Sequence, residues 1–278
     1  MSQEESVTET NLPFPIFKRG KVRDVYDLKD RLLIVSTDRI SAFDVILPNG
    51  IPHKGEALNR LSNYWFDKTG KIVPNHVLDV IDPRIVLVKK TDPIKIEFVV
   101  RGYLYGSLWE NYRKGKVTSL PKGLEKAEKL FNPILTPTTK ADVGHDTELS
   151  KEDVENQIGK PLATEIEEAS IKIYELASKK AEKSGIIVAD TKLEFGIFNN
   201  ELMLIDECLT PDSSRFWSKS KYRTGQDQFS YDKQYVRDYL IEIGWNKTPP
   251  APKLPERVIA ETSKKYVEAY ERLTGRKF

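Results

Sequence analysis

The order of hydrophobic and polar positions predicts mainly strands and hairpins up to about residue 93, and a mixture of strands and helices after it. Short apolar runs at 31–36, 85–90 and 94–101 have the length and the flanking residues of strands. Apolar residues recur at helical spacing over 55–69 and again over 161–184. The chain therefore contains both kinds of element, and its strands are concentrated on the N-terminal side.

Residues 116–149 show neither pattern and are expected to be irregular, because Pro121, Pro133 and Pro137 interrupt them. A stretch of this length without secondary structure in a compact domain is usually functional or mobile. A short helix is expected before it, at 107–114, and two further helices after it, at 232–243 and 255–274.

One predicted strand carries a row of charges. It enters through Ile186 and continues as Asp190-Thr191-Lys192-Leu193-Glu194. Because side chains alternate between the two faces of a strand, Asp190, Lys192 and Glu194 project from the same face. A lysine between two acids suits a site in which the lysine contacts phosphate oxygens and the carboxylates hold a metal ion. The alternative is a solvated sheet face, on which lysine beside acidic residues is ordinary.

The following run returns antiparallel after a predicted hairpin turn at Asn199-Asn200, and it ends in Asp206. A strict two-residue turn would pair Glu194 with Ile205 and leave Asp206 on the opposite face. If Glu194 and Asp206 are to share a metal ion, the hairpin needs an odd-length loop or a β-bulge near its end. We expect one of these two irregularities.

A basic turn near the N-terminus has the composition of a phosphate-binding loop. Gly20, Lys21 and Arg23 lead into a strand, and in such a turn backbone N–H groups and cations can converge on phosphates. The turn is not a Walker A loop, and the sequence contains no G-x-G-x-x-G motif. The alternative is an ordinary surface hairpin with basic residues.

Two other strand ends carry polar side chains. Arg101 ends a predicted strand and Ser107 begins a predicted helix, whose free backbone N–H groups favour an anion. Asp44 closes a cluster of hydroxyl and charged residues after another strand. Sites are often assembled at such positions, although a simple hydrogen-bonded turn is the alternative for Asp44.

The composition excludes several classes of protein. The 278 residues carry 44 Lys and Arg against 42 Asp and Glu, a net charge of +2, so nothing predicts a protein that coats nucleic acid. No apolar run is long enough to span a membrane, and the first residues show no secretory signal. A single cysteine, Cys208, excludes an internal disulfide and a cysteine-rich zinc site. We therefore expect a cytoplasmic protein.

Four segments with glycine, charged and hydroxyl residues follow one another in a specific order. They are Gly20–Tyr26, the E-x-x-x-R-x-x-x-x-G-S run at Glu97–Ser107, the D-x-K-x-E-F-G run at Asp190–Gly196, and Asp206-Glu207 followed by Ser213–Trp217. Together they resemble the SAICAR synthetase family of purine biosynthesis. Each motif alone is modest, but the four span nearly the whole chain in the family's order.

The resemblance implies an α+β fold in which a small β-rich N-terminal domain, residues 1–93, covers a larger α/β domain, residues 94–278. ATP is expected in the cleft between them, as in kinase-like and ATP-grasp proteins. The implied reactants are ATP, Mg²⁺, carboxyaminoimidazole ribonucleotide (CAIR) and L-aspartate, with no nucleic acid or membrane partner. The implied intermediate is an acyl phosphate. Chain length permits a monomer or a homodimer.

The resemblance also implies residue roles toward the nucleotide, the metal ion and catalysis. Lys192 neutralises the charge that is transferred, and Asp190 accepts from the imidazole amine or positions it. The ATP phosphates lie near Gly20, Lys21, Arg23 and Lys89. The expected ligands of Mg²⁺ are Glu194 and Asp206, and Asp146 belongs to a second metal ion or to closure of the irregular loop.

For the other substrates, the resemblance implies that Arg101, Ser107 and Arg215 bind the phosphate and carboxylate of the ribonucleotide. Asp44 is expected near its amine. The aspartate site is expected near 136–146, where no single residue is diagnostic.

Two other functions compete with this one. A kinase-like phosphotransferase would use the same lysine and acids, but it needs a positioned base for a hydroxyl and no amine substrate. A noncatalytic nucleotide- or RNA-binding module is disfavoured by the balanced charge and by the intact Lys192, Glu194 and Asp206. A structural protein without a metal ion has only its charged surface in its favour. ADP release that depends on aspartate separates the ligase from the phosphotransferase.

Overall fold

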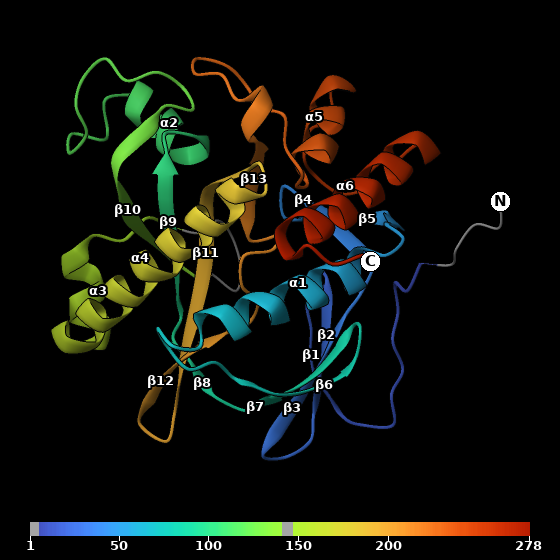
Figure 1. Cartoon of the computed structure of the whole chain (residues 1–278). Coiled ribbons are helices and arrows are strands. Elements are labelled where there is room, and N and C mark those ends of the chain that lie inside the picture. Colours follow the sequence, from blue (N-terminus) through green and yellow to red (C-terminus); the bar gives the residue numbers. More distant parts are fainter. Residues whose placement is uncertain (1–5, 141–146) are drawn as a thin grey trace.

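The computed structural model describes residues 6–140 and 147–278, and two antiparallel sheets dominate it (Figure 1). The first sheet has the strand order β1-β2-β3-β7-β6, and all its strands come from the N-terminal third of the chain. They are β1 (Ile16–Arg19), β2 (Arg23–Asp27), β3 (Arg31–Ser36), β6 (Val77–Asp82) and β7 (Ile85–Lys89).

The second sheet is built around one long strand, β11 (Ile186–Phe198), which carries the row of charges. Four strands pair with β11, and β10 pairs with β9 at the edge. The partners are β8 (Asp92–Pro93), β9 (Ile96–Tyr103), β12 (Glu201–Ile205) and β13 (Ser214–Ser218), and the edge strand is β10 (Lys129–Thr139). Because β11 pairs with strands on both sides, it holds the row of charged side chains in place within the sheet.

A small two-stranded sheet and six α-helices complete the described part of the chain. Figure 1 shows α4 lying across β9 and β11, and α1 lying along the first sheet. The bounds are β4 (Arg39–Ala42), β5 (Val45–Gly50), α1 (Lys54–Thr69), α2 (Gly106–Arg113), α3 (Lys151–Ile158), α4 (Lys160–Lys183), α5 (Gln234–Glu242) and α6 (Glu256–Thr274), with a 3₁₀ turn at Lys219–Lys221.

The main hydrophobic core joins α1 and α4 to β9 and β11. Trp65, Phe98, Ile173, Leu193 and Phe195 belong to it and are almost completely buried. Each buried side chain of this size contributes roughly 1.5–3 kcal/mol of hydrophobic stabilisation. The core therefore clamps the apolar face of β11 and leaves its charged face turned the other way.

The sequence-based expectation of an α+β fold is confirmed, and the predicted helices and most strands are present within a few residues of their expected ends. The last strand of the first sheet ends at Lys89 and the first strand of the second sheet begins at Asp92, so the sheets change just before the predicted boundary at 93. The main core does not stop there, because α1 packs its apolar side chains with β9, β11 and α4. The division at 93 into two domains stays a prediction.

The prediction that 116–149 is irregular is wrong for the middle of this segment. There β10 pairs with β9 in the register Ile134↔Arg101 to Thr139↔Ile96. Pro133 and Pro137 misled the prediction. Because β10 lies at the edge of the sheet, a proline there need not remove a ladder hydrogen bond, and prolines are tolerated in edge strands.

The predicted irregularity in the hairpin is also wrong. Asn199 and Asn200 form a strict two-residue turn with positive φ at both positions, and Glu194 pairs with Ile205 without a bulge. The chain instead leaves the strand at Asp206, whose φ of 68° is left-handed. This single backbone change redirects Asp206, which lines the same cleft as Glu194.

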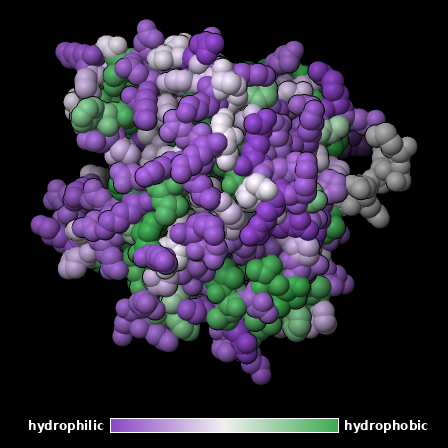
Figure 2. Space-filling model, viewed as in Figure 1, coloured by the Kyte–Doolittle hydropathy of each residue, from purple (hydrophilic) through white to green (hydrophobic). Residues whose placement is uncertain are grey.

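The surface agrees with the charged composition. The face in Figure 2 is largely hydrophilic, with apolar side chains gathered low in the view, where the first sheet lies. Exposed apolar residues of the edge strand β6 are Leu78, Val80 and Ile81. In the part of the chain described, no helix combines the length and apolar character that crossing a membrane would require.

Candidate active site

A cleft of about 680 Å³ collects most of the predicted site residues. Its walls come from the β1–β2 turn, the β4–β5 turn, β11, the segment after β12, β13 and the start of α5. The predicted residues that line it are Gly20, Lys21, Arg23, Asp44, Lys192, Glu194, Asp206 and Arg215. Segments from both ends of the chain thus converge on one space.

The charged row of β11 faces polar partners, as its alternation predicts. Leu193 and Phe195 are buried in the core, while Lys192 and Glu194 line the cleft. Lys192 Nζ lies 2.7 Å from Glu97 Oε1 and also donates to Glu194. Burial alone would lower the pKa of Lys192, but the nearby carboxylates of Glu194, Asp206 and Glu97 raise it well above its usual value. Lys192 therefore remains an ammonium group and acts as a fixed positive charge.

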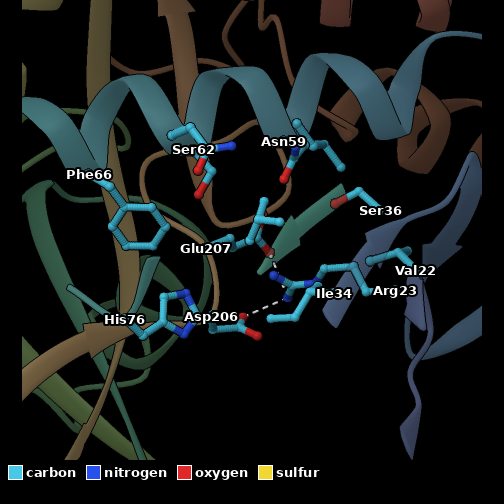
Figure 3. A pocket seen from close by; sticks show the side chains of 13 residues that line it. Val22, Arg23, Ile34, Ser36, Asn59, Ser62, Phe66, His76, Asp206 and Glu207 are labelled. Atoms are coloured by element: carbon cyan, nitrogen blue, oxygen red, sulfur yellow. Dashed lines mark hydrogen bonds and ion pairs between the residues drawn. The ribbon is translucent and has the colours of Figure 1, made fainter. Parts of the chain in front are cut away.

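Arg23 connects the first sheet to the end of β12. Its guanidinium lies 2.6 Å from Asp206 Oδ2 and 3.4 Å from Glu207 Oε1. Figure 3 marks these contacts with dashed lines. Burial opposes ionisation of both acids, yet Arg23 and Lys192 hold the pKa of Asp206 below its usual range. The pKa of Glu207 is raised, chiefly by burial. Asp206 is therefore the more readily ionised carboxylate of this pair.

A small cavity of about 20 Å³ lies behind Arg23, between α1 and the first sheet. Figure 3 shows His76 beside Asp206 and Phe66 at one side of it. His76 is buried and its Nε2 atom has no hydrogen-bond partner among the described residues. Burial lowers the pKa of His76 to about 4, so this imidazole is neutral near pH 7.

Glu194 and Asp206 are the described carboxylates that fit a hard cation in this cleft. Glu194 is almost buried and paired with Lys192 and Lys140, and Asp206 is paired with Arg23. Among the residues that the structure describes, no cluster of three or more potential metal ligands is present. Two carboxylates suit Mg²⁺ that is also bound by phosphate oxygens, because such an ion needs few protein ligands. The predicted third residue, Asp146, lies outside the described residues.

The basic turn lies at the mouth of the cleft. The N–H group of Gly20 donates to the Arg23 carbonyl at 2.7 Å, which closes the tight turn between β1 and β2. Lys21 forms an ion pair with Asp44 across the opening. Both side chains are largely exposed, so their mutual attraction is weak and a bound anion can displace it.

Arg101 and Ser107 lie behind the cleft wall, in a cluster organised by Asp190. Arg101 donates to Thr136 Oγ1 at 2.8 Å and to Ser107 Oγ at 3.0 Å, and its Nη1 atom is 3.6 Å from Asp190 Oδ2. Neither Arg101 nor Ser107 lines the cleft. Arg215 does, and it donates to Asp190 from β13.

The turn before α2 makes room for Arg215. Gly106 has a φ of +60°, and a Cβ atom at this position would lie 2.8 Å from Arg215 Nη2. A side chain at 106 would therefore both strain the backbone and push the guanidinium away. The G-S pair of the second motif is thus explained by the packing of Arg215 on the start of α2.

Lys89 is the predicted residue that lies apart from the others. Its Nζ atom is 3.8 Å from Met203 Sδ and 5.4 Å from the centre of the Phe198 ring, and Lys89 does not line the cleft. Its contact with ATP stays a prediction.

Sequence reasoning did not assign a site role to seven other charged residues that line the cleft. They are Lys18, Glu97, Lys140, Glu207, Asp212, Lys233 and Arg237. Glu97 opens the E-x-x-x-R motif, so the motif itself could have indicated it. Lys233 and Arg237 are four residues apart at the start of a predicted helix, a spacing that places them on one face.

The comparisons with known proteins agree over nearly the whole chain. The family model described as SAICAR synthetase matches residues 16–252. A phosphoribosylaminoimidazole-succinocarboxamide synthase from Thermodesulfovibrio yellowstonii is 50% identical over 97% of this chain and 99% of its own length.

Two solved structures show the same likeness in three dimensions. A SAICAR synthase from Saccharomyces cerevisiae, complexed with SAICAR, has a TM-score of 0.90 at 40% identity and covers 98% of this chain and 99% of that chain. A type-2 SAICAR synthetase in complex with ADP has a TM-score of 0.73 at 27% identity, with coverages of 94% and 98%.

Proposed function

The chain belongs to the SAICAR synthetase family, and we propose that it joins L-aspartate to the carboxylate of CAIR at the expense of ATP, giving SAICAR, ADP and phosphate in purine biosynthesis. One observation carries the assignment to this cleft. Arg23 and Asp206, 183 residues apart in the sequence, meet beside Lys192 and Glu194. This arrangement concentrates the charges that phosphoryl transfer requires.

The chemistry requires activation of a carboxylate, because an oxide ion is a very poor leaving group. In the proposed first step, a CAIR carboxylate oxygen attacks the γ-phosphorus of ATP, and ADP leaves. In the second step, the neutral amine of aspartate attacks the acyl carbon, inorganic phosphate leaves with the former carboxylate oxygen, and the nitrogen loses a proton. Catalysis of both steps depends mainly on positioning and on charge neutralisation.

The cleft residues suit these two reaction steps. Lys192, held as an ammonium group by Glu97 and Glu194, offsets the negative charge of the transferred phosphoryl group. Glu194 and Asp206 would hold Mg²⁺, which supplies Lewis-acid neutralisation of the phosphates when bound. Arg23 fixes Asp206 in its ionised form.

The remaining assignments follow from where the side chains lie. Gly20 and Lys21 at the mouth of the cleft suit the ATP phosphates. Arg215, supported by the Arg101–Ser107–Asp190 cluster, suits the ribonucleotide phosphate, since a forked guanidinium binds phosphate through paired hydrogen bonds. Asp44 would lie near the amine of the imidazole once ligands displace Lys21 from it.

The function is tested by measuring phosphate release from ATP and Mg²⁺ while CAIR and L-aspartate are each omitted in turn. We expect release only when both are present, together with a succinocarboxamide product. ADP formation without aspartate, or with an alcohol in its place, would favour the phosphotransferase instead. With CAIR labelled by ¹⁸O in its carboxylate, an acyl phosphate transfers one label to inorganic phosphate, and unlabelled phosphate would exclude that intermediate.

A further inference from the structure

Arg39, the first residue of β4, has no role in the proposed reaction, yet it holds the turn between β1 and β2 from behind. Its Nε atom donates to the Lys21 carbonyl at 3.2 Å, and its Nη2 atom donates to the Gly20 carbonyl at 3.1 Å. The Arg39 side chain is 14% exposed and does not line the cleft. It therefore contacts the backbone of the turn and not the space in which a ligand would lie.

These two contacts determine which way the turn presents its N–H groups. The C=O and N–H groups of a trans peptide bond point in opposite directions. Both carbonyls point toward Arg39, so the N–H groups of the same two peptide bonds, at Lys21 and Val22, point away from it. Neither N–H group donates a hydrogen bond to another residue in the described part of the chain. Because Lys21 and Val22 line the cleft, the turn offers it two unused donors of the kind that bind phosphate.

Arg39 is itself fixed by a buried carboxylate. Asp24 is completely buried, and its two oxygens accept from Arg39 Nη2 at 2.7 Å and from Thr10 Oγ1 at 2.7 Å. Burial alone would raise the pKa of Asp24, but the hydrogen bonds from Arg39 and Thr10 hold it below its usual value. Asp24 is therefore an ionised anchor that orients the guanidinium toward the turn.

The N-terminal segment 6–12, which we call the N-terminal strap, lies on the same side of β2 as this anchor. Side chains alternate along a strand, and Arg23 of β2 lines the cleft. Asp24 and Tyr26 project from the opposite face, where the Thr10 hydroxyl donates to Asp24 and lies 2.6 Å from the Tyr26 hydroxyl. One strand thus connects the cleft on one face with the strap on the other.

The backbone of the strap is bonded to Arg39 and to its neighbour. Arg39 Nη1 donates to the Thr8 carbonyl at 2.7 Å. The Val7 N–H group donates to Asp38 Oδ2 at 2.7 Å, and the Asp38 N–H group donates to the Val7 carbonyl at the same distance. With its contacts to the turn and to both oxygens of Asp24, the guanidinium makes five hydrogen bonds, as many as its N–H groups allow. Arg39 is therefore the point at which the strap, the buried acid and the turn are joined.

We propose that Arg39 is a positioning residue for ATP, which holds the turn so that its free N–H groups face the phosphates, and that the N-terminal strap holds Arg39 in place. This inference rests on the proposed function, in which the ATP phosphates lie at Gly20 and Lys21. Donors that are already aligned bind an anion without the cost of ordering the turn. A lysine cannot replace Arg39 here, because its ammonium group is a compact charge and does not span the turn, the acid and the strap together.

The kinetic test compares Arg39→Lys with the wild type and with Arg31→Lys, a control at an exposed arginine of β3 outside the cleft. Arg39→Lys keeps a positive charge beside Asp24, so the protein should fold while the contacts with the turn are lost. Losing the alignment of one hydrogen bond to a charged phosphate corresponds to about 10-fold or more in affinity. We therefore expect the KM of ATP to rise at least 10-fold and those of CAIR and aspartate to change less than threefold. Circular dichroism and thermal melting verify folding.

A second readout does not depend on turnover. ADP with Mg²⁺, and separately adenosine, are titrated calorimetrically into each variant. Arg39→Lys should lose at least 10-fold in affinity for ADP but less than threefold for adenosine, which has no phosphate. An equal loss for both ligands would show that Arg39 supports only the fold, and it would overturn the proposal.

Thr10→Val and Thr10→Ser test the strap without changing Arg39. Valine is close to threonine in size but lacks the hydroxyl that binds Asp24, whereas serine keeps it. The KM of ATP should rise at least threefold for Thr10→Val and less than twofold for Thr10→Ser. If Arg39→Lys does not fold, this pair decides, and equal KM values of ATP in the two folded variants would contradict the proposal.

The outcomes separate this inference from the function on which it rests. If the wild type forms ADP without aspartate, the proposed ligase function fails, while the ADP and adenosine affinities still decide the role of Arg39. If the wild type requires aspartate but folded Arg39→Lys binds ADP as tightly as the wild type does, only the positioning role is wrong. A rise confined to the KM of CAIR would also overturn it.

Discussion

Glu194→Gln is the substitution that tests the centre of the site most directly. It keeps the size of the side chain and one acceptor oxygen, but it removes the charge that pairs with Lys192 and Lys140 and that would, under the proposed function, bind a cation. Glu194 is only 4% exposed, so its charge acts in a poorly screened environment. We expect kcat to fall about 10²–10³-fold, which corresponds to roughly 2.7–4 kcal/mol of transition-state stabilisation.

The cost in folding stability should be much smaller. Removing one partner of a fully buried pair costs about 3–5 kcal/mol, because the other charge is left uncompensated. Here Lys192 keeps Glu97 at 2.7 Å, and Lys140 is 37% exposed and can be solvated. Each lost pair therefore approaches the value for exposed pairs, about 0–1 kcal/mol, and we expect a total loss of about 1–2 kcal/mol.

The assay combines steady-state kinetics at several Mg²⁺ concentrations with urea unfolding. Glu201→Gln, an exposed glutamate at the turn end of the same hairpin, is the matched control and should behave as wild type. The half-maximal Mg²⁺ concentration should rise for Glu194→Gln alone. A kcat within threefold of wild type would remove Glu194 from the metal site. A loss of activity that follows a loss of folded protein would refute the argument from charge.

Three further predictions concern the substrate site, the buried charges and pH. Arg215→Ala should raise the KM of CAIR far more than that of ATP, and equal effects in steady-state kinetics would contradict a CAIR role. Lys54→Met should lower the free energy of unfolding in urea by about 3–5 kcal/mol at pH 7, because Asp212 stays buried and loses its 2.8 Å partner; a loss under 1 kcal/mol would contradict this. His76 has a folded pKa of about 4, below its unfolded value, so the unfolded state binds the proton first as pH falls. Its contribution to stability is therefore complete above about pH 6.5 and decreases toward pH 4, by up to ~1.4 kcal/mol per unit, and this slope should diminish in His76→Gln.

Local sequence pattern was sufficient for much of the fold. Helical spacing located α1 and α4 within about a residue, because an apolar stripe must face a core whatever that core is. The pattern failed at β10, where Pro133 and Pro137 argued against a strand. Their tolerance depends on β10 being an edge strand, and position within a sheet is not a local property.

The site shows the same division. The common face of Asp190, Lys192 and Glu194 follows from the two-residue period of any strand, so the sequence determined it without knowledge of the fold. The place of Asp206 does not follow, since hairpin register alone assigns it to the opposite face. A left-handed φ of 68° redirects it, and Arg23 holds it from another sheet.

The partners of the other cleft charges could not be predicted from the sequence at all. Examples are residues 54, 212, 233 and 237. Nothing in the sequence near Lys54 indicates that it is buried against Asp212, in the wall of the cleft that Lys233 and Arg237 also line. Which charges pair and which remain available to a ligand depends on contacts between segments far apart in the chain. The sequence determined the kinds of charged group and the faces of the strands that carry them. The tertiary structure decided their partners, because pairing energies depend on distance and burial, which only packing sets.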